Sequence, residues 1–186
     1  VRFRVLASQR QKVFALGGDL SFFKQCIESR DEKSLANYAR KAVDLIWESL
    51  SGSGRAEMLT ISLVQGDAQG GGFEAALAGH ILVAERNATF GFPEGLFGMF
   101  PGMGARQLLR ARATDSIACQ LIGSARRYTA QELFDLGVVD LLANEGEGWR
   151  TVNNICHSPS AAKWARLRDR FGNVSKREMS EDVERW

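Results

Sequence analysis

The sequence lacks several features that would assign it at once to a broad class. No uninterrupted apolar run approaches the roughly 20 residues of a membrane span. No signal peptide is visible at the start, where Arg2 and Arg4 interrupt the apolar residues. The net charge of +2 gives no argument for nucleic acid. We therefore expect a globular protein with neither a membrane nor a nucleic-acid partner.

Cysteine and histidine are scarce, and their positions exclude further kinds of site. Cys26, Cys119 and Cys156 are odd in number and lack paired spacing, which favours reduced thiols in a cytoplasmic protein. Cys156 and His157 are neighbours without a second such pair, so we expect no metal site. No G-x-S-x-G sequence occurs, and neither histidine has a serine partner in a motif, which argues against a serine hydrolase.

Strand-like and helix-like segments alternate along most of the chain. Met58–Val64 and Ile81–Ala84 are apolar runs typical of buried strands, and 34–50 has helical spacing. This alternation predicts an α/β fold with parallel pairing. We divide the chain into a core, residues 1–145, and a C-terminal helical region, residues 146–186.

Local signals predict where several of these segments begin and end. Asp19, Thr114 and Thr129 precede helical patterns as N-caps. Ser51–Gly54 has the composition of a flexible loop, and Val138–Leu142 that of a strand.

Two glutamates stand in surroundings that do not suit a charge. Glu74 follows the glycines Gly70, Gly71 and Gly72 in an apolar segment, and Glu94 lies in a Gly/Phe/Pro loop. A carboxylate there is costly to desolvate unless it is hydrogen-bonded or has a raised pKa. If both meet in one pocket, they can act as general acid and general base.

The sequence around these glutamates resembles the crotonase (enoyl-CoA hydratase/isomerase) family. The glycine run followed by Glu74 matches G-G-G-x-E, and GFPEGLFGMFPGMGA matches G-x-P-E…P-G-x-G-A. FALGGDL resembles F-x-A-G-x-D-L, with Leu16 replacing the usual alanine. The details VQGDAQGGGFEAAL, FPGMGA and YTAQEL…LGVVD are most similar to the diffusible signal factor synthases of this family.

The resemblance implies a fold and an activity. The fold would be a spiral of ββα units with a C-terminal helical region, without the family's N-terminal strands, because Val1 already precedes FALGGDL. The enzyme would dehydrate a 3-hydroxyacyl thioester of acyl carrier protein or CoA to a cis-2-enoyl product. It would then hydrolyse the thioester and release an unsaturated fatty acid quorum-sensing signal. The alternative is an enoyl-CoA hydratase or isomerase of fatty-acid metabolism. Neither needs a cofactor, and the family forms homotrimers or other homo-oligomers.

The resemblance also assigns residues to roles. Glu74 and Glu94 would be catalytic, and the backbone N–H groups of Gly18 and Gly71 would form the oxyanion hole. We expect six residues to contact the substrate, with core packing as the alternative for the apolar ones: Gly70, Gly72, Phe92, Leu96, Met99 and Phe100.

Other interpretations remain beside this one. Gly70-x-Gly72-x-x-Ala75 satisfies a dinucleotide fingerprint, but five residues separate these glycines from the preceding strand. His80 is either a further base or, as we expect, a structural residue. Retention of both glutamates argues against a non-catalytic scaffold. A basic run either meets an acidic carrier protein or is solvated helix surface: Arg106, Arg110, Arg112, Arg126 and Arg127.

Overall fold

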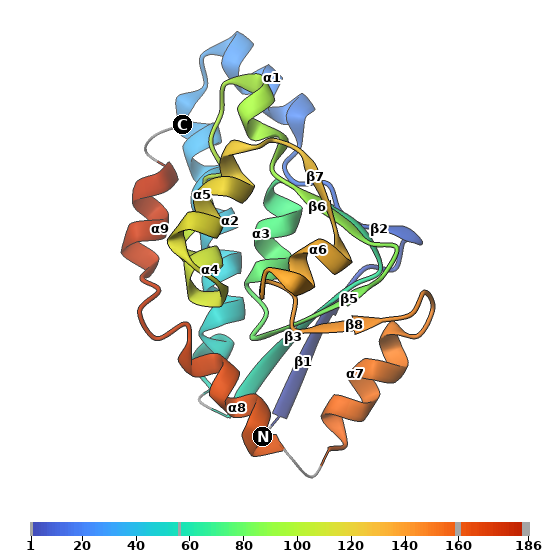
Figure 1. The fold of residues 1–186 in the computed structure, drawn as a ribbon. Helices are drawn as coiled ribbons and strands as arrows, with labels where there is room; N and C mark the ends of the chain where they lie inside the picture. The colour runs from blue at the N-terminus through green and yellow to red at the C-terminus, as the bar shows by residue number, and fades with distance from the viewer. Residues whose placement is uncertain (1, 56, 159–160, 184–186) are drawn as a thin grey trace.

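The computed structural model describes residues 2–55, 57–158 and 161–183 (Figure 1). The strands are β1 (Arg2–Ala7), β2 (Lys12–Ala15), β3 (Met58–Val64), β4 (Gly66–Gln69), β5 (Ile81–Glu85), β6 (Thr89–Gly91), β7 (Arg127–Thr129) and β8 (Leu141–Ala143). The helices are α1 (Leu20–Ser29), α2 (Glu32–Leu50), α3 (Gly71–Leu77), α4 (Ala105–Arg112), α5 (Asp115–Gly123), α6 (Ala130–Asp135), α7 (Gly148–Cys156), α8 (Ala161–Asp169) and α9 (Lys176–Val183). Two 3₁₀ turns are η1 (Gly52–Gly54) and η2 (Pro93–Phe97). Residues 159–160 and 184–186 of the predicted C-terminal helical region lie outside the described residues.

The strands form two sheets with helices packed around them. One sheet has the order β1-β3-β5-β8 and is parallel throughout. The other has the order β2-β4-β6-β7, with β6 and β7 antiparallel. Figure 1 shows α2, α4, α5 and α9 on one side of the molecule, and α7 and α8 beside the first sheet. The predicted α/β fold with parallel pairing is confirmed, apart from the antiparallel β6–β7 pair.

The first sheet separates two apolar cores. Ile61 and Leu63 point to a smaller core completed by α7 and α8, whereas Val64 and Leu82 point to the larger one. This alternation follows from the period of two along a strand. Helix α3 contacts β2, β3, β4 and α4, so it lies between the sheets and the helical layer.

The three predicted N-caps are confirmed. The Asp19 side chain accepts from the N–H groups of Ser21 and Phe22, and the Thr114 hydroxyl accepts from the Ile117 N–H. Thr129 forms a capping box with Glu132 at the start of α6.

Three details differ from the sequence prediction. The expected loop at 51–54 contains the 3₁₀ turn η1. The expected strand at 138–142 begins only at Leu141, because the N–H groups of Val138 and Val139 both bond to the Leu133 carbonyl and close the turn after α6. Strand β4 was not predicted, since its sequence GDAQ has low strand propensity and depends on pairing with β2 and β6.

The described part of the chain contains neither a membrane-spanning helix nor a disulfide. Among the described residues, no helix is both long and apolar enough to cross a membrane. Cys26, Cys119 and Cys156 are all free thiols, in agreement with the prediction from their spacing.

His80 is a structural residue in this fold. It is fully buried, and its Nδ1 accepts from the Thr60 N–H at 2.9 Å. The other ring nitrogen lies 3.0 Å from the Leu50 carbonyl and therefore donates to it. Burial lowers the pKa of His80 to about 4, so the ring is neutral and ties β3 to the end of α2.

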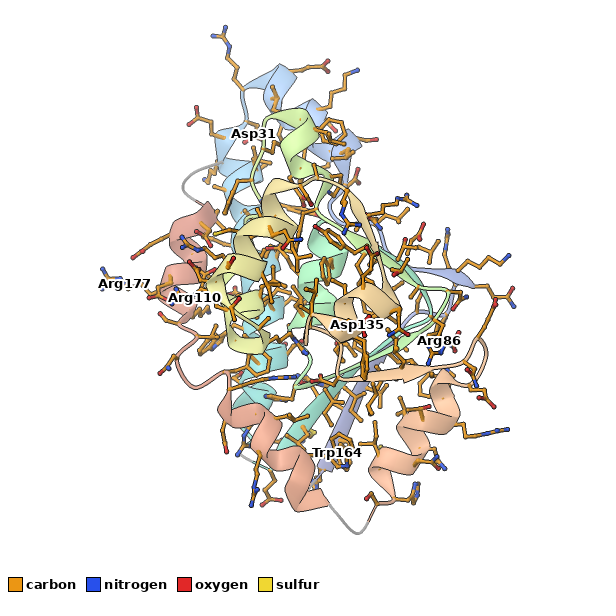
Figure 2. All side chains as sticks on the ribbon, in the orientation of Figure 1. Asp31, Arg86, Arg110, Asp135, Trp164 and Arg177 are labelled. Carbon is orange, nitrogen blue, oxygen red and sulfur yellow. The ribbon has the colours of Figure 1, made fainter. Side chains whose placement is uncertain are left out.

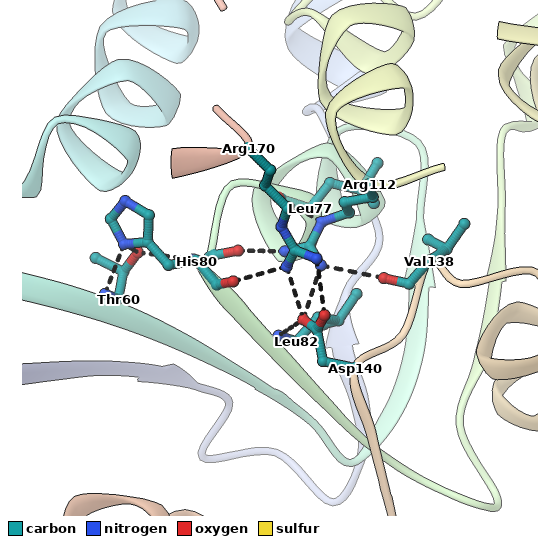
Figure 3. A network of polar contacts seen from close by, with 9 residues as sticks. Thr60, Leu77, His80, Leu82, Arg112, Val138, Asp140 and Arg170 are labelled. Atoms are coloured by element: carbon teal, nitrogen blue, oxygen red, sulfur yellow. Dashed lines mark hydrogen bonds and ion pairs between the residues drawn. The ribbon is translucent and has the colours of Figure 1, made fainter. Parts of the chain in front are cut away.

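A buried cluster of two arginines and one aspartate joins distant parts of the chain (Figure 3). The Arg112 side chain is fully buried and donates to the carbonyls of Leu77, Gly79 and Val138 and to Asp140. Arg170 donates to both Asp140 oxygens and, at 2.7 Å, to the carbonyl of His80. The cluster therefore fixes the C-terminal end of α3.

Asp140 compensates the two positive charges of this cluster. Burial acts to raise the pKa of Asp140. The guanidinium groups of Arg112 and Arg170 outweigh this effect and hold the pKa below its ordinary value. Because its pKa is lower in the folded state, Asp140 stabilises the fold at pH values above its unfolded-state pKa. This contribution is lost as pH falls through the folded-state pKa.

We predict that Asp140→Asn destabilises the protein by about 3–5 kcal/mol at neutral pH, because it leaves two guanidinium groups without their carboxylate. Urea unfolding should show this as a lower midpoint, and the difference from wild type should shrink as pH falls below about 4. Asp135→Asn, at an exposed carboxylate of α6 that Figure 2 labels, is the matched control. An equal loss in both variants would contradict the role of the cluster.

Candidate active site

A cavity of about 300 Å³ lies where the end of β2, the start of α3, helices α1 and α2, and η2 meet. Its walls are mostly apolar, and two carboxyl groups, those of Glu74 and Glu94, face it. The larger apolar side chains come from three stretches of the chain: Leu16, Leu20, Phe23, Leu45, Ile46, Phe97, Met99 and Met103. Two acids distant in sequence are thus brought to one pocket.

Glu74 lies on α3 and is 1% exposed. Its Oε1 accepts hydrogen bonds from the backbone N–H groups of Met103 at 2.8 Å and Ala105 at 3.0 Å. Burial raises the pKa of Glu74 to about 8, and the negative charges of Glu94 and Asp182 add to this rise, while the two hydrogen bonds oppose it. At neutral pH the folded protein therefore favours a protonated Glu74.

Glu94 follows Pro93 at the start of η2 and approaches the glycine run. Its Oε2 is buried and has no hydrogen-bond partner among the described residues. Burial also raises the pKa of Glu94. A Cβ atom at Gly70 would come 2.6 Å from Glu94 Oε1, and Gly70 has φ +54°. Only glycine fits this position without moving the carboxyl group.

The glycines predicted as backbone donors lie on the wall of the cavity. Gly18 and Gly71 both line it. A Cβ on Gly17 would lie 3.2 Å from the Gly71 nitrogen, and a Cβ on Gly72 would lie 2.1 Å from the Ala15 carbonyl oxygen. The end of β2 and the start of α3 are therefore in backbone contact, which places the two predicted amides on neighbouring segments.

The structure separates the predicted substrate-contact residues into two groups. Gly70, Gly72 and Met99 line the cavity. Phe92, Leu96 and Phe100 do not. Phe92 is buried and stacks on Phe73 with ring centroids 4.7 Å apart. Leu96 is 70% exposed, and Phe100 lines a second hollow instead.

Several lining residues were not identified from the sequence. Tyr38, Leu45 and Ile46 come from α2, and Met103 comes from the loop before α4. Helical spacing showed that α2 has an apolar face. It could not show which part of that face meets the site, because this depends on how α2 packs against α3 and β2.

The predicted basic run does not form a free positive surface. Arg112 belongs to the buried cluster, so its inclusion in the run was wrong. The other four arginines each lie within 3.5 Å of a carboxylate: Arg106 and Arg110 pair with Asp115, Arg126 with Glu132, and Arg127 with Asp67. Three carboxylates therefore offset most of the charge of these four arginines, with Asp115 shared by two of them.

No group of three or more His, Cys, Asp or Glu side chains with metal-site geometry occurs in the described ranges.

Comparisons with known proteins place the chain in a family. A family profile described as "Enoyl-CoA hydratase/isomerase" matches residues 1–158. A short-chain-enoyl-CoA hydratase of Clostridium acetobutylicum is 32% identical over 155 residues, which is 82% of this chain and 56% of that protein. A probable enoyl-CoA hydratase of Bacillus subtilis is 31% identical over 72% of this chain and 49% of its own length. The chain thus spans about half the length of these curated relatives.

Solved structures share the fold. The Pseudomonas aeruginosa protein DspI matches 90% of this chain and 61% of its own, with a TM-score of 0.73 and 27% identity. An enoyl-CoA hydratase of Bacillus halodurans matches the whole chain and 74% of its own, with a TM-score of 0.83 at 20% identity, which shows the fold alone.

We predict that the raised pKa of Glu74 makes stability depend on pH. The unfolded carboxyl ionises near pH 4.3, whereas the folded one ionises at about 8. The contribution of Glu74 to stability should be fully present below about pH 4 and should be lost as pH rises to about 8. Urea unfolding of Glu74→Gln should show a smaller decline over this range, while Glu28→Gln, at an exposed position on α1, should keep the wild-type slope. Identical slopes in wild type and Glu74→Gln would show that Glu74 is not held protonated.

Proposed function

We propose that this chain, which belongs to the enoyl-CoA hydratase/isomerase family, interconverts 3-hydroxyacyl and 2-enoyl thioesters by removing or adding water. The observation that carries the proposal is the convergence of Glu74 and Glu94 on one apolar cavity. Two carboxyl groups in the same poorly solvated site favour one shared proton, so one group can donate while the other accepts.

The pKa directions support an assignment of these roles. Glu74 is almost fully buried, and the negative charges of Glu94 and Asp182 add to the rise of its pKa, so we assign it the proton. In dehydration, ionised Glu94 takes the proton from C2 as the C2–H bond breaks. The C3–O bond breaks as Glu74 protonates the departing hydroxyl, which leaves as water while the C2=C3 bond forms. Hydration runs the same steps in reverse.

The thioester carbonyl needs a separate partner. Removal of the C2 proton develops negative charge on the carbonyl oxygen, which pre-positioned N–H donors can stabilise. We assign this role to the backbone amides of Gly18 and Gly71, which line the cavity on adjacent segments. No cofactor enters these steps.

The acyl chain has an apolar path available. We assign it to the part of the cavity lined by Phe23, Leu45, Ile46, Phe97 and Met99. Phe92, Leu96 and Phe100 are not carried into this assignment, because they lie outside the cavity. We assign no preference between CoA and an acyl carrier protein as the thiol carrier. The arginines expected to meet an acidic carrier protein are paired with carboxylates of this chain.

Apolar side chains at the mouth of the cavity support a homo-oligomer. Leu16, Leu20 and Leu45 are 62%, 59% and 61% exposed and also line the cavity. Burial of such side chains against another subunit would remove apolar surface from water.

The finer proposal is that the enzyme forms a diffusible signal factor. In this case, dehydration gives a cis-2-enoyl thioester, and a water molecule then attacks C1. The C–S bond breaks, and a free unsaturated acid and a thiol are released. The motifs VQGDAQGGGFEAAL, FPGMGA and YTAQEL…LGVVD support this reading.

We predict that Glu74→Gln and Glu94→Gln each lower kcat by about 10²–10⁴-fold, because each removes one proton-transferring group. The loss of the enoyl thioester chromophore on hydration measures the rate. Glu28→Gln controls for the loss of a carboxylate outside the cavity. Wild-type rates in either cavity variant would remove that glutamate from the mechanism.

A further prediction concerns the products formed from 3-hydroxyacyl thioesters of CoA and of acyl carrier protein, which mass spectrometry can identify. A free cis-2-enoic acid with an equal amount of thiol is expected for a signal factor synthase. Accumulation of the enoyl thioester alone would contradict thioester hydrolysis and favour a plain hydratase.

A further inference from the structure

Helix α9 packs directly behind the backbone that holds Glu74. Met179 is fully buried, and a Cβ atom at Gly104 would lie 2.8 Å from the Cγ and Cε atoms of Met179. Gly104 stands between Met103 and Ala105, whose N–H groups both donate to the Glu74 carboxyl. The Met179 side chain thus supports the short turn that places both donors.

Gly104 is needed for this packing. It has φ +96°, which side chains rarely adopt, and the space that a Cβ would fill is taken by Met179. Shortening Met179 would leave a cavity against the turn, and the backbone would be free to move toward it. The distance between the two amides and Glu74 would then no longer be fixed.

Besides Glu74 and Glu94, a third carboxylate, that of Asp182 on α9, lies near the site. Asp182 is three residues after Met179, so the two side chains share one face of α9. Asp182 is 6% exposed and lines the second hollow, about 690 Å³ in volume, which Arg106 also lines. Its negative charge acts on Glu74, together with that of Glu94 in the catalytic cavity. Arg106, whose charge also interacts with Asp182, is paired with Asp115.

We propose that α9 is a positioning element for Glu74, in which Met179 fixes the Met103–Ala105 turn and Asp182, buried on the same face of the helix, adds a negative charge to the surroundings of the site. The helix lies beyond residue 158, where the family profile ends. None of the motifs around Glu74 and Glu94 includes it. The inference rests on the proposed role of Glu74, but its first test does not require turnover.

The first test measures the ionisation of Glu74 directly, by infrared difference titration of the carboxyl band that disappears in Glu74→Gln. Removing a nearby negative charge favours the ionised form, so Asp182→Asn should ionise Glu74 at a lower pH than wild type. Arg177→Ala, at an exposed position of α9 that Figure 2 labels, should leave the titration unchanged. An unchanged titration in Asp182→Asn would overturn the electrostatic part of the proposal.

The second test separates positioning from stability by kinetics. Met179→Ala should lower kcat by about 10- to 100-fold, since a displacement of about 1 Å can cost about 10²-fold. Its KM should stay near that of wild type, because Met179 does not line the cavity. Met179→Leu, which keeps the volume, should restore most of kcat. If Met179→Ala fails to fold, Met179→Leu and Gly104→Ala remain, and Gly104→Ala should lower kcat in the same way.

The outcomes distinguish the two proposals. A wild-type enzyme without hydratase activity, in which Asp182→Asn still shifts the Glu74 titration, would refute the proposed function and support the placement of Asp182. Equal loss of kcat in Met179→Ala and Arg177→Ala would show that α9 acts only through overall stability and would overturn the positioning role.

Discussion

A carboxyl group enclosed beside a second carboxyl group cannot ionise freely, and this constraint governs the structure around Glu74. The group is removed from water, faces Glu94, and receives two backbone N–H bonds at 2.8 and 3.0 Å. These bonds lower the cost of ionisation without cancelling it. The result is a group that holds a proton near neutral pH and can release it when a charge develops nearby. Such a poised state is what acid–base chemistry on a thioester requires.

The rest of the fold keeps this arrangement rigid from several directions. At the start of α3, Gly72 lies against the Ala15 carbonyl, so α3 cannot slide along β2. At the end of α3, Arg112 donates to the carbonyls of Leu77 and Gly79, and Arg170 donates to that of His80 just beyond the helix. Both arginines are themselves held by Asp140. Because both ends of this seven-residue helix are fixed, the position of Glu74 between them is fixed as well. Stability and the geometry of the site therefore depend on the same contacts.

The sequence predicted the chemical groups of the site better than its walls. Glu74 and Glu94 could be paired from the sequence for two reasons. A carboxylate in apolar surroundings is costly to desolvate, which suggests a function, and both glutamates lie in motifs of the family. Phe92 and Leu96 could not be placed in the same way. One is buried against Phe73 and the other points to solvent, although both flank Glu94 in the same loop. The direction of a side chain in an irregular segment depends on tertiary contacts that no periodic pattern records. Arg112 was misplaced for a related reason: it lies on a helix, but only the fold shows that this helix turns that residue inward.

Residues that react with a substrate and residues that hold them in place differ in how well a sequence reveals them. Residues that touch a substrate must keep specific atoms in specific places, so they occur in short motifs that can be read from sequence. Residues that support them need only the right volume or charge at one point in space, and they can come from anywhere in the chain. Met179 and Arg170 lie far along the chain from the glycine run. Met179 nevertheless packs on the turn that binds Glu74, and Arg170 donates to the His80 carbonyl just after the helix that carries Glu74. A motif search therefore locates the reacting groups and leaves their supports unseen. The C-terminal helices are where the structure adds most to the sequence.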